Sequence, residues 1–384
     1  MKRSSERILT THTGSLPRPD DLLALLRQKE AAEQFDAAAL SARVKSAVAE
    51  VVRRQLEAGI DIVNDGEMGK PSYSTYVKDR LNGFEGSEKS APLYAADLGE
   101  FRDFTRRGGR ETGVTVLKRP ACTGPISYRD REAVRIDADN LKAAMAAASP
   151  TEAFMSAASP GVVTFFLSNK HYPTHEAYIR AIAEAMRTEY EAICAAGFVL
   201  QVDCPDLAMS RHIQFKDLSL ADFRRTIEMH IDALNHALAN VPPDRVRLHL
   251  CWGNYEGPHH YDVPLRDIID VVLKARVGAI SYEASNPRHE HEWAVFKDVK
   301  LPDGKILIPG VIDSVTNFIE HPELVAQRIS NVARLVGREN VIAGTDCGFA
   351  TVAGSSRVDG AIAWAKLKAM ADGARLASKE LWKA

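Results

Sequence analysis

The chain repeats a two-part unit, in which an amphipathic helix pattern leads into a short apolar run. In the clearest unit, apolar residues recur at four-residue spacing from Leu40 to Leu56, Gly59 ends the pattern, and IDIVNDGE follows. Such spacing indicates a helix with one apolar face, and a run of β-branched residues without alternation indicates a parallel strand covered on both sides. A chain built from these units is expected to form a parallel sheet covered by helices.

The unit recurs often enough to define a fold class. We predict about eight strands, at RILTTHTGS, IDIVNDGE, SPGVVTFFLSN, FVLQVDCPD, VRLHLCWGN, VGAISYEAS, KILIPGVIDS and NVIAGTDCG. Eight alternating units favour a (β/α)8 TIM barrel, here a single catalytic domain over residues 1–384. A doubly wound open sheet is the alternative, but no GxGxxG or GxxxxGK follows any strand.

Residues 70–158 do not fit the repeat. We interpret them as a long insertion over the C-terminal mouth of the barrel, with a helical part in the Ala-rich stretch 141–158.

Composition excludes several classes of partner. The 49 basic and 51 acidic residues give a net charge of −2, and no dense Lys and Arg cluster suggests nucleic acid. No apolar run reaches the roughly 18 residues that span a bilayer, and MKRSSERILTTHTGS lacks the apolar segment of a signal peptide, so we expect a cytoplasmic protein. The five cysteines form no disulfide framework, which leaves metal binding as a role for some of them.

Four residues at predicted strand ends suggest a metal site. His249 and Cys251 are two apart and therefore point to the same side of their strand. Glu283 ends the next strand and Cys347 ends the last one, and barrel active sites gather at these C-terminal strand ends. Two thiolates, an imidazole and a carboxylate form a tetrahedral ligand set suited to zinc.

This set resembles a known family. Together with TTHTGSLPRP near the start, DGE after the second strand, QVDCPD after the fourth and DCG at the eighth, it is similar to the catalytic barrel of cobalamin-independent methionine synthase. The resemblance implies a zinc-dependent methyltransferase of methionine biosynthesis, in which zinc binds the thiol of homocysteine and the thiol attacks a methyl group on a reduced folate. It also implies that Ser15, Glu67 and Asp203 hold the amino-acid end of homocysteine.

Two positions depart from the family pattern. Where the family places an aromatic ring after the third strand, to stack on the pterin, this chain has Ser168 and Asn169. Where the family has an acid histidine after the seventh strand, this chain keeps Asp313 but has Val315. Because protonation of the leaving amine accelerates its departure, we expect a simpler or more activated alkyl donor than a folate.

Further residues near the strand ends are candidates for the pocket lining: His12, Trp252, His259, His260 and Asp313. A core position for His12, and a solvent-facing loop for His259 and His260, are the alternatives. Cys204 lies beside Asp203 and is either a substrate contact or a buried bystander, whereas Cys122 and Cys194 are expected in the core. Arg18 and Arg288 are anion contacts or surface residues, and PRHEHEW at 287–293 is interpreted as a charged lip.

Three other functions remain open at the level of sequence. An epoxyalkane–coenzyme M transferase of the same superfamily needs no pterin platform, but Glu67 and Asp203 would repel a sulfonate. A metal-free lyase similar to uroporphyrinogen decarboxylase would not need four metal ligands. A purely structural zinc site is usually formed by ligand pairs close in sequence, unlike these.

Overall fold

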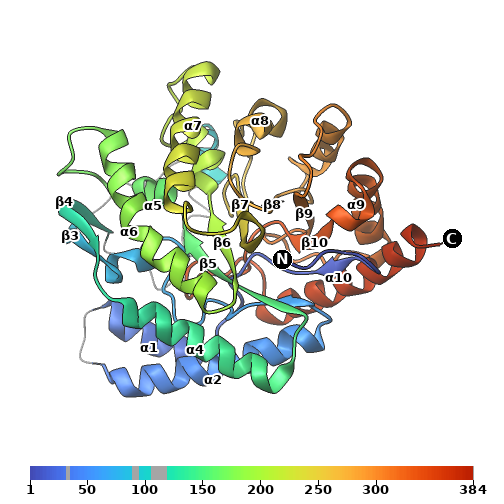
Figure 1. The fold of residues 1–384 in the computed structure, drawn as a ribbon, viewed down its shortest axis with the longest axis horizontal. Coiled ribbons are helices and arrows are strands. Elements are labelled where there is room, and N and C mark those ends of the chain that lie inside the picture. The colour runs from blue at the N-terminus through green and yellow to red at the C-terminus, as the bar shows by residue number, and fades with distance from the viewer. Residues whose placement is uncertain (32–34, 89–94, 105–118, 384) are drawn as a thin grey trace.

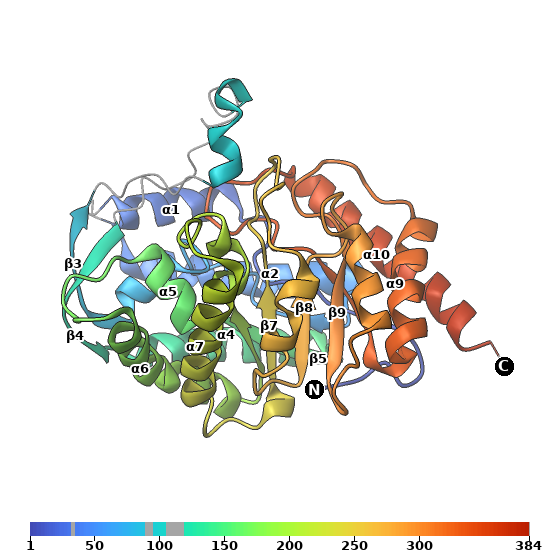
Figure 2. The same ribbon diagram turned by 90° about the horizontal axis from the view of Figure 1, so that it is seen from above.

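The structure is a computed structural model that describes residues 1–31, 35–88, 95–104 and 119–383. Helices surround a central parallel sheet, with α6 and α7 on one side and α9 and α10 on the other (Figures 1 and 2). In this described part of the chain, the sheet has eight strands in the order β1-β10-β9-β8-β7-β6-β5-β2. Among the same residues, no helix is long and apolar enough to cross a lipid bilayer.

The strands of this sheet are β1 Leu9–Thr10, β2 Ile62–Val63, β5 Glu152–Ala158, β6 Val199–Asp203, β7 Val246–Leu250, β8 Ala279–Tyr282, β9 Ile306–Ile312 and β10 Ile342–Thr345. The helices are α1 Asp20–Glu30, α2 Ala37–Glu57, α4 Arg131–Ala148, α5 Pro160–Phe166, α6 His175–Ala195, α7 Leu220–Ala237, α8 Ile269–Val272, α9 Pro322–Val336 and α10 Gly360–Leu381. Short 3-10 helices include η1 Thr75–Asp79, η2 Ala96–Gly99, η3 Pro205–Leu207, η4 Met209–Arg211 and η7 Glu290–Lys297.

The two edge strands of the sheet meet and nearly close it into a barrel. The Asp61 N–H donates to the Thr10 carbonyl at 3.2 Å, and the Thr11 hydroxyl donates to the Ile62 carbonyl at 3.1 Å. The predicted TIM barrel is therefore confirmed.

Successive side chains of each strand point to opposite faces of the sheet, and this produces two separate apolar cores. Leu248 and Leu250 of β7 belong to the large core between sheet and helices, whereas Arg247 and His249 point into the barrel. The barrel interior is filled by a second cluster, formed by Leu9, Ile62, Phe154, Val199, Ala279, Ile306, Ile308 and Ile342. This packed floor leaves the C-terminal strand ends free for polar side chains.

One predicted strand was wrong. Residues 159–169 contain helix α5, and the third barrel strand is β5, which lies in the stretch predicted to be helical from Leu141 to Ala158. Ser159 caps α5 by accepting from the Val162 N–H, and Pro160 occupies its first turn. Capping and proline placement set the helix start here, despite the apolar run that suggested a strand.

The segment predicted as an insertion is partly barrel. Helix α4 packs between α2 and α6, and β5 pairs with β2 and β6, so both complete the barrel repeat. The remainder contains the antiparallel hairpin of β3 Leu81–Glu88 and β4 Arg119–Tyr128, which packs on α6. It also contains η2, where the buried Asp97 accepts from the Tyr255 hydroxyl at 2.8 Å and the His259 N–H at 2.7 Å. Because both partners follow β7, η2 lies at the C-terminal mouth.

Candidate metal and thiol site

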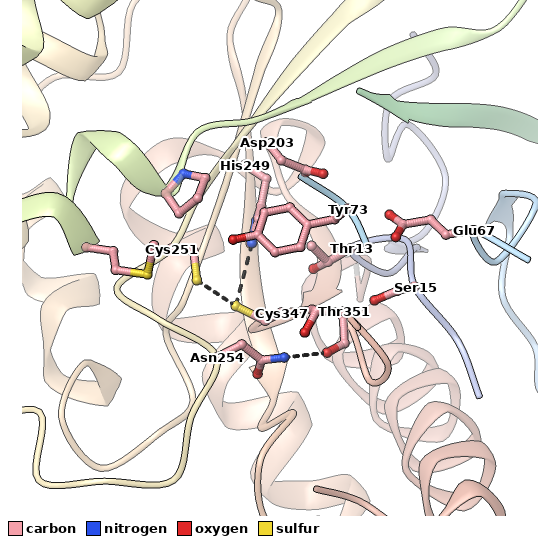
Figure 3. A pocket seen from close by; sticks show the side chains of 13 residues that line it. Thr13, Ser15, Glu67, Tyr73, Asp203, His249, Cys251, Asn254, Cys347 and Thr351 are labelled. Carbon is pink, nitrogen blue, oxygen red and sulfur yellow. Dashed lines mark hydrogen bonds between the residues drawn. The ribbon is translucent and has the colours of Figure 1, made fainter. Parts of the chain in front are cut away.

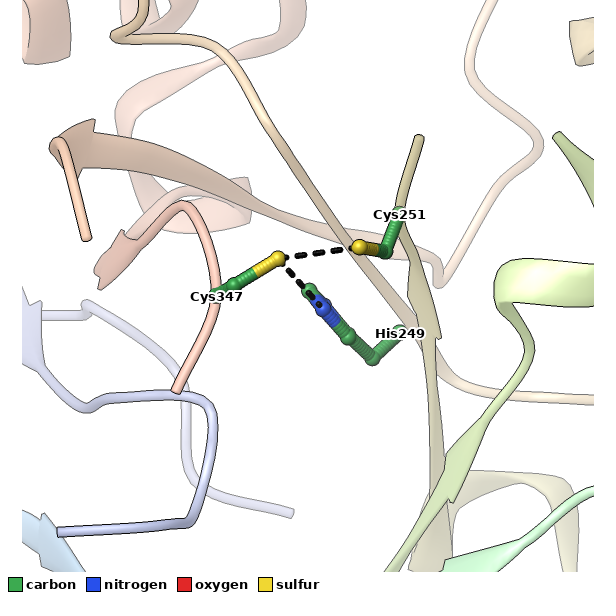
Figure 4. Close-up of side chains that lie close together, drawn as sticks. All are labelled: His249, Cys251 and Cys347. Atoms are coloured by element: carbon green, nitrogen blue, oxygen red, sulfur yellow. Dashed lines mark hydrogen bonds between the residues drawn. The ribbon is translucent and has the colours of Figure 1, made fainter. Parts of the chain in front are cut away.

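Three predicted ligands meet at the C-terminal end of the barrel (Figure 4). His249 points inward from β7, Cys251 follows the end of β7, and Cys347 follows β10. The Cys251 and Cys347 sulfurs are 3.0 Å apart, and the Cys347 sulfur lies 3.6 Å from His249 Nε2. All three ligand atoms lie within 4.8 Å of one another and are buried, so one ion could contact all of them.

Glu283 stands at the edge of this group. Its Oε1 lies 3.6 Å from the Cys347 sulfur and accepts from the Trp252 N–H at 2.7 Å. Its Oε2 accepts from Asn286 Nδ2 at 2.8 Å. The structure therefore brings the four predicted ligands together, with the carboxylate held by two hydrogen bonds beside the sulfur and imidazole ligands.

Burial favours the neutral forms of the imidazole and the two thiols. Burial, and then Arg247, lower the pKa of His249 to about 3, so its imidazole is unprotonated. A hydrogen bond from Cys347 lowers the pKa of Cys251, but burial and the Glu283 carboxylate outweigh it and raise that pKa to about 12. Burial raises the pKa of Cys347 as well. A metal ion would replace these thiol protons, because coordination deprotonates a thiol outright.

A cavity of about 410 Å³ adjoins the three ligands (Figure 3). It brings together residues from the ends of several strands and from the loops that follow them. Its lining consists of Thr13, Ser15, Glu67, Tyr73, Asp203, Pro205, Met209, His249, Cys251, Asn254, Cys347, Gly348 and Thr351.

The three predicted substrate residues all line this cavity. Glu67 and Asp203 are 1% and 4% exposed, and Glu67 Oε1 accepts from the Ser156 hydroxyl at 2.7 Å. Glu67 Oε2 is buried and has no hydrogen-bond partner among the described residues. Burial, and then the charge of Glu67, raise the pKa of Asp203 well above its usual range. The cavity wall therefore carries two buried carboxyl groups, one of which has an oxygen without a partner among the described residues.

Two glycines allow side chains to come close to the backbone at this wall of the cavity. Gly14 has φ +140°, and a Cβ there would lie 2.8 Å from Glu67 Oε1. A Cβ on Gly348, directly after Cys347, would lie 2.0 Å from the Ser15 hydroxyl oxygen. The TGS and DCG motifs are thus adjacent in space, and their glycines bring Ser15 against the last strand end.

The buried Arg247 holds Asp203 in place through Gln201. Arg247 donates to Gln201 Oε1 at 2.8 Å and to the His12 carbonyl at 2.7 Å, and its guanidinium lies 3.4 Å from the centre of the Phe154 ring. Gln201 Nε2 in turn donates to Asp203 Oδ1 at 2.7 Å. Burial lowers the pKa of Arg247 to about 9, which still leaves it charged at neutral pH. The Asp203 carboxyl group is therefore positioned by residues of the barrel floor.

Two of the candidate pocket residues lie elsewhere. His12 is a core residue, because its Nε2 pairs with Gln55 Oε1 at 2.7 Å, its Nδ1 accepts from the Gly14 N–H, and its ring packs on Phe154. Trp252 is completely buried and its Nε1 donates to the Val263 carbonyl at 2.7 Å, so it cannot serve as a platform in the cavity. Its position next to Cys251 turns the side chain away, as expected for consecutive residues of an extended segment.

The remaining candidates surround two neighbouring depressions. Asp313 and His259 line a second cavity of about 840 Å³ that also contains Glu283 and Asn254. His260 lines a third depression and contacts Glu100 at the surface. His259 lies beside Glu283 in the second cavity and His260 lies near the surface, whereas the grouped ligands are His249, Cys251 and Cys347.

Other expectations need correction. Arg18 is neither an anion contact nor a surface residue, because its buried guanidinium donates to the carbonyls of Glu67, Lys70 and Ala350. The segment 287–293 is not simply a charged lip, since His289 and Glu292 are 2% and 4% exposed. Arg288 remains at the surface and donates to the His260 carbonyl.

The cysteines outside the metal group divide by burial. Cys204 and Cys122 are fully buried, as predicted for bystanders in the core, whereas Cys194 is only partly buried.

Tyr73 is a cavity residue that the sequence did not reveal. Its N–H donates to the Thr351 carbonyl, and the neighbouring Ser72 forms a bridge with Val352. This contact joins the segment after β2 to the segment after β10 and places the Tyr73 ring beside His249 and Cys251 (Figure 3). The pairing is between residues far apart in sequence, so no local pattern signals it.

An aromatic ring does follow the third strand. Ser168 and Asn169 follow helix α5 and not the third strand. The true strand β5 is followed by Phe165 and Phe166 in α5, and the Phe166 ring lies 5.9 Å from the Tyr73 ring in an edge-on arrangement. Neither phenylalanine is among the residues that line the cavity, so the missing stacking ring stays a prediction, as does the missing acid at Val315.

The fold and the site define a class: a TIM-barrel enzyme with a buried thiol–imidazole group for a metal at its C-terminal mouth. A model of the family described as cobalamin-independent synthase, catalytic domain, matches residues 8–97 and 112–375. The chain belongs to this family, as its motifs predicted.

Individual relatives agree with this assignment. The methionine synthase of Sulfolobus acidocaldarius is 26% identical over 343 residues, which cover 88% of this chain and 85% of the relative. The 2-hydroxypropyl-CoM lyase of Xanthobacter autotrophicus is 25% identical over 367 residues, covering 89% and 87% of the two chains. A solved B12-independent methionine synthase from Shewanella sp. W3-18-1 has the same fold, with a TM-score of 0.74, 21% identity, and coverage of 98% of this chain and 99% of that chain.

Proposed function

We propose that the protein is a zinc-dependent S-alkyltransferase that transfers a methyl or similar alkyl group to an amino-acid thiol such as homocysteine. The observation that carries this proposal is one cavity that joins the His249, Cys251 and Cys347 group to the buried carboxyl groups of Glu67 and Asp203. One catalytic domain over residues 1–384 would hold both substrates.

The donor set fits zinc. Two sulfurs, one imidazole nitrogen and the Glu283 carboxylate make a ligand set that zinc favours over calcium or magnesium. Zinc held there would supply a thiolate nucleophile at neutral pH by binding the sulfur of the incoming thiol. The Ser281 hydroxyl, 3.2 Å from His249 Nδ1, fixes the ring so that Nε2 faces the two cysteines.

The carboxyl groups of Glu67 and Asp203 would favour a thiol substrate that also carries an ammonium group. Glu67 Oε2, unpaired within the described chain, would accept a hydrogen bond from the substrate ammonium, and Asp203 lies close enough to share the charge. The same arrangement disfavours thiols that carry a sulfonate in place of an amine, because like charges would meet in a buried space.

The methionine synthase relative supports methyl transfer as the reaction. In such a transfer the sulfur forms a bond to the methyl carbon as the bond from that carbon to the leaving atom breaks. A leaving amine must gain a proton, which Val315 cannot supply, so a donor that needs little protonation fits this chain better.

The alternative is an epoxyalkane–thiol transferase. It is favoured by the similarity to a protein named 2-hydroxypropyl-CoM lyase, a name that describes reaction at a hydroxyalkyl thioether. Glu67 and Asp203 favour the amino-acid thiol over this alternative.

Metal analysis combined with thiol binding tests the proposal. We expect about one zinc per chain in the purified protein, loss of that zinc in Cys347→Ser, and a new sulfur in the X-ray absorption spectrum when homocysteine is added. Coenzyme M serves as the competing thiol. Full zinc retention by Cys347→Ser would refute the ligand assignment, and a new sulfur only with coenzyme M would establish the alternative.

A further inference from the structure

A buried histidine outside the ligand group is held between two carboxylates. His289 Nε2 lies 3.0 Å from Asp262 Oδ2, and His289 Nδ1 lies 2.9 Å from Glu292 Oε2. Carboxylates only accept hydrogen bonds, so both ring nitrogens must carry protons, and a neutral imidazole carries one. The geometry therefore indicates an imidazolium at position 289.

The electrostatics agree with this geometry. Burial alone would lower the pKa of His289, but its hydrogen bonds to Asp262 and Glu292 outweigh burial and raise the pKa to about 10. Both carboxylates are themselves fixed, since Glu292 Oε1 accepts from the Leu265 N–H at 2.7 Å and Asp262 Oδ2 also pairs with His259 Nδ1 at 2.8 Å.

The charged ring lies flat on Trp252. The ring centroids are 4.2 Å apart and the planes differ by 29°, a stacked arrangement in which a cation attracts the face of the indole. On its edge, the indole Nε1 donates to the Val263 carbonyl at 2.7 Å. Both the plane and the rotation of the Trp252 side chain are thereby set.

The backbone of Trp252 reaches the metal group directly. Its N–H donates to Glu283 Oε1 at 2.7 Å, and Cys251 is the residue before it. A fixed indole therefore also fixes the peptide bond between Cys251 and Trp252. The N–H of this peptide bond holds the Glu283 carboxylate, and Cys251 on its other side carries a sulfur ligand. Outer contacts of this kind set ligand orientation and metal affinity in metal sites generally.

We propose that His289 and Trp252 are positioning residues of the metal group: the imidazolium, held by Asp262 and Glu292, stacks on Trp252 and so orders the Cys251 sulfur and the Glu283 carboxylate for zinc. This role rests on the proposed function only in assuming that His249, Cys251, Glu283 and Cys347 bind zinc. Neither residue contacts the thiol cavity, so they act through the ligands and not on the substrate.

Zinc affinity of the folded protein tests the proposal, measured by competition with a chromophoric chelator. His289→Gln removes the charged ring, Trp252→Leu removes the stack, and Trp252→Phe keeps an aromatic face. We expect the first two to bind zinc about 10- to 100-fold more weakly and Trp252→Phe to stay near the parent. His260→Gln, a surface histidine paired with Glu100, is the matched control and is expected to bind like the parent.

The outcomes separate this inference from the function it rests on. A parent protein that binds no zinc overturns both. A parent that binds zinc, with a folded His289→Gln of equal affinity, overturns the positioning role alone. Where His289→Gln fails to fold, the comparison of Trp252→Leu with Trp252→Phe decides, and equal affinity of these two variants overturns the role. The melting temperature of each metal-free variant shows whether it is folded at the temperature of the measurement.

Discussion

At the scale of single residues, Glu67 and Asp203 form an unfavourable electrostatic arrangement in the wall of the cavity. Two adjacent buried carboxyl groups repel each other, and one oxygen is left without a partner in the described chain. In the proposed function, the substrate ammonium would pair with this oxygen and relieve the repulsion.

We predict that Asp203→Asn weakens homocysteine binding by roughly 2 to 5 kcal/mol, because a buried charge partner of the ammonium is lost. Calorimetry on the zinc-loaded protein measures the effect. A thiol of similar length without an amine is the control, and its affinity should change little. Equal binding of homocysteine to parent and variant would contradict the assigned role.

His12 gives a pH dependence that does not involve the metal group. Burial lowers its pKa to about 3, against about 6.5 in the unfolded chain. Between these values the unfolded chain binds a proton that the folded chain does not, so the free energy of unfolding falls as the pH decreases below about 6.5. From pH 7.5 to 5.0 the loss from this residue is about 2 kcal/mol.

We therefore predict that His12→Gln loses less stability than the parent over this pH range. Urea unfolding of both proteins at each pH measures the difference, in which the other titrating groups cancel. His291→Gln, at an exposed position, is the control and should follow the parent. Parallel pH curves for His12→Gln and the parent would refute the effect.

Some residues of the site could be predicted from the sequence and others could not. His249, Cys251, Glu283 and Cys347 were predicted because strand period and strand order place them at one edge. Tyr73 and His289 were not, because their roles depend on contacts between loops, for which the chain carries no periodic signal.

At the scale of secondary structure, most strands and helices of the barrel could be predicted, and the third strand could not. The run PGVVTFF of α5 is apolar and β-branched like a buried strand, and AFMSAA of β5 continues an Ala-rich stretch like a helix. Tertiary packing overrides both local preferences.

One buried carboxylate ties both β4 of the hairpin and the preceding η1 to helix α6. Glu189 of α6 accepts from the Tyr76 hydroxyl at 2.5 Å and from the Tyr128 hydroxyl at 2.6 Å. Glu189→Gln keeps the size of the side chain but cannot accept both bonds at their present positions, because one oxygen becomes an N–H donor.

We predict that Glu189→Gln destabilises the protein by about 1 to 3 kcal/mol, the cost of one unpaired buried phenol. The midpoint of urea unfolding reports this loss, and hydrogen exchange should show faster opening of β3 and β4. Glu191→Gln, two residues further along α6, is the control. An unchanged midpoint for Glu189→Gln would show that the anchor contributes nothing to stability.

At the scale of the whole molecule, the proposed reaction draws on residues that follow several different strands of the barrel. Ser15, Glu67, Asp203 and Cys347 follow β1, β2, β6 and β10, respectively. The position at which the family has its acid histidine follows β9. Asp313 remains there, accepting from the Val315 N–H at 2.9 Å, but the Val315 side chain can give no proton. His259 does not replace it as arranged, since both of its ring nitrogens are engaged, one by Asp262 and one by the Tyr255 carbonyl.

We predict that methyl-tetrahydrofolate is a poor donor for this protein and that Val315→His improves it. An imidazole at this position, beside the Asp313 carboxylate, would supply the proton that the leaving amine requires, and general acid catalysis is worth on the order of a hundredfold or more. Methyl transfer from the monoglutamyl folate to homocysteine measures the gain, and Val315→Gln, which adds a polar group without an acid, should show none. Phe166 supplies a ring near Tyr73 in parent and variants alike, so any gain is attributable to the acid. Parent turnover within the ordinary enzyme range of roughly 1 to 10³ per second would show instead that the folate is the natural donor and that the proton comes from another group.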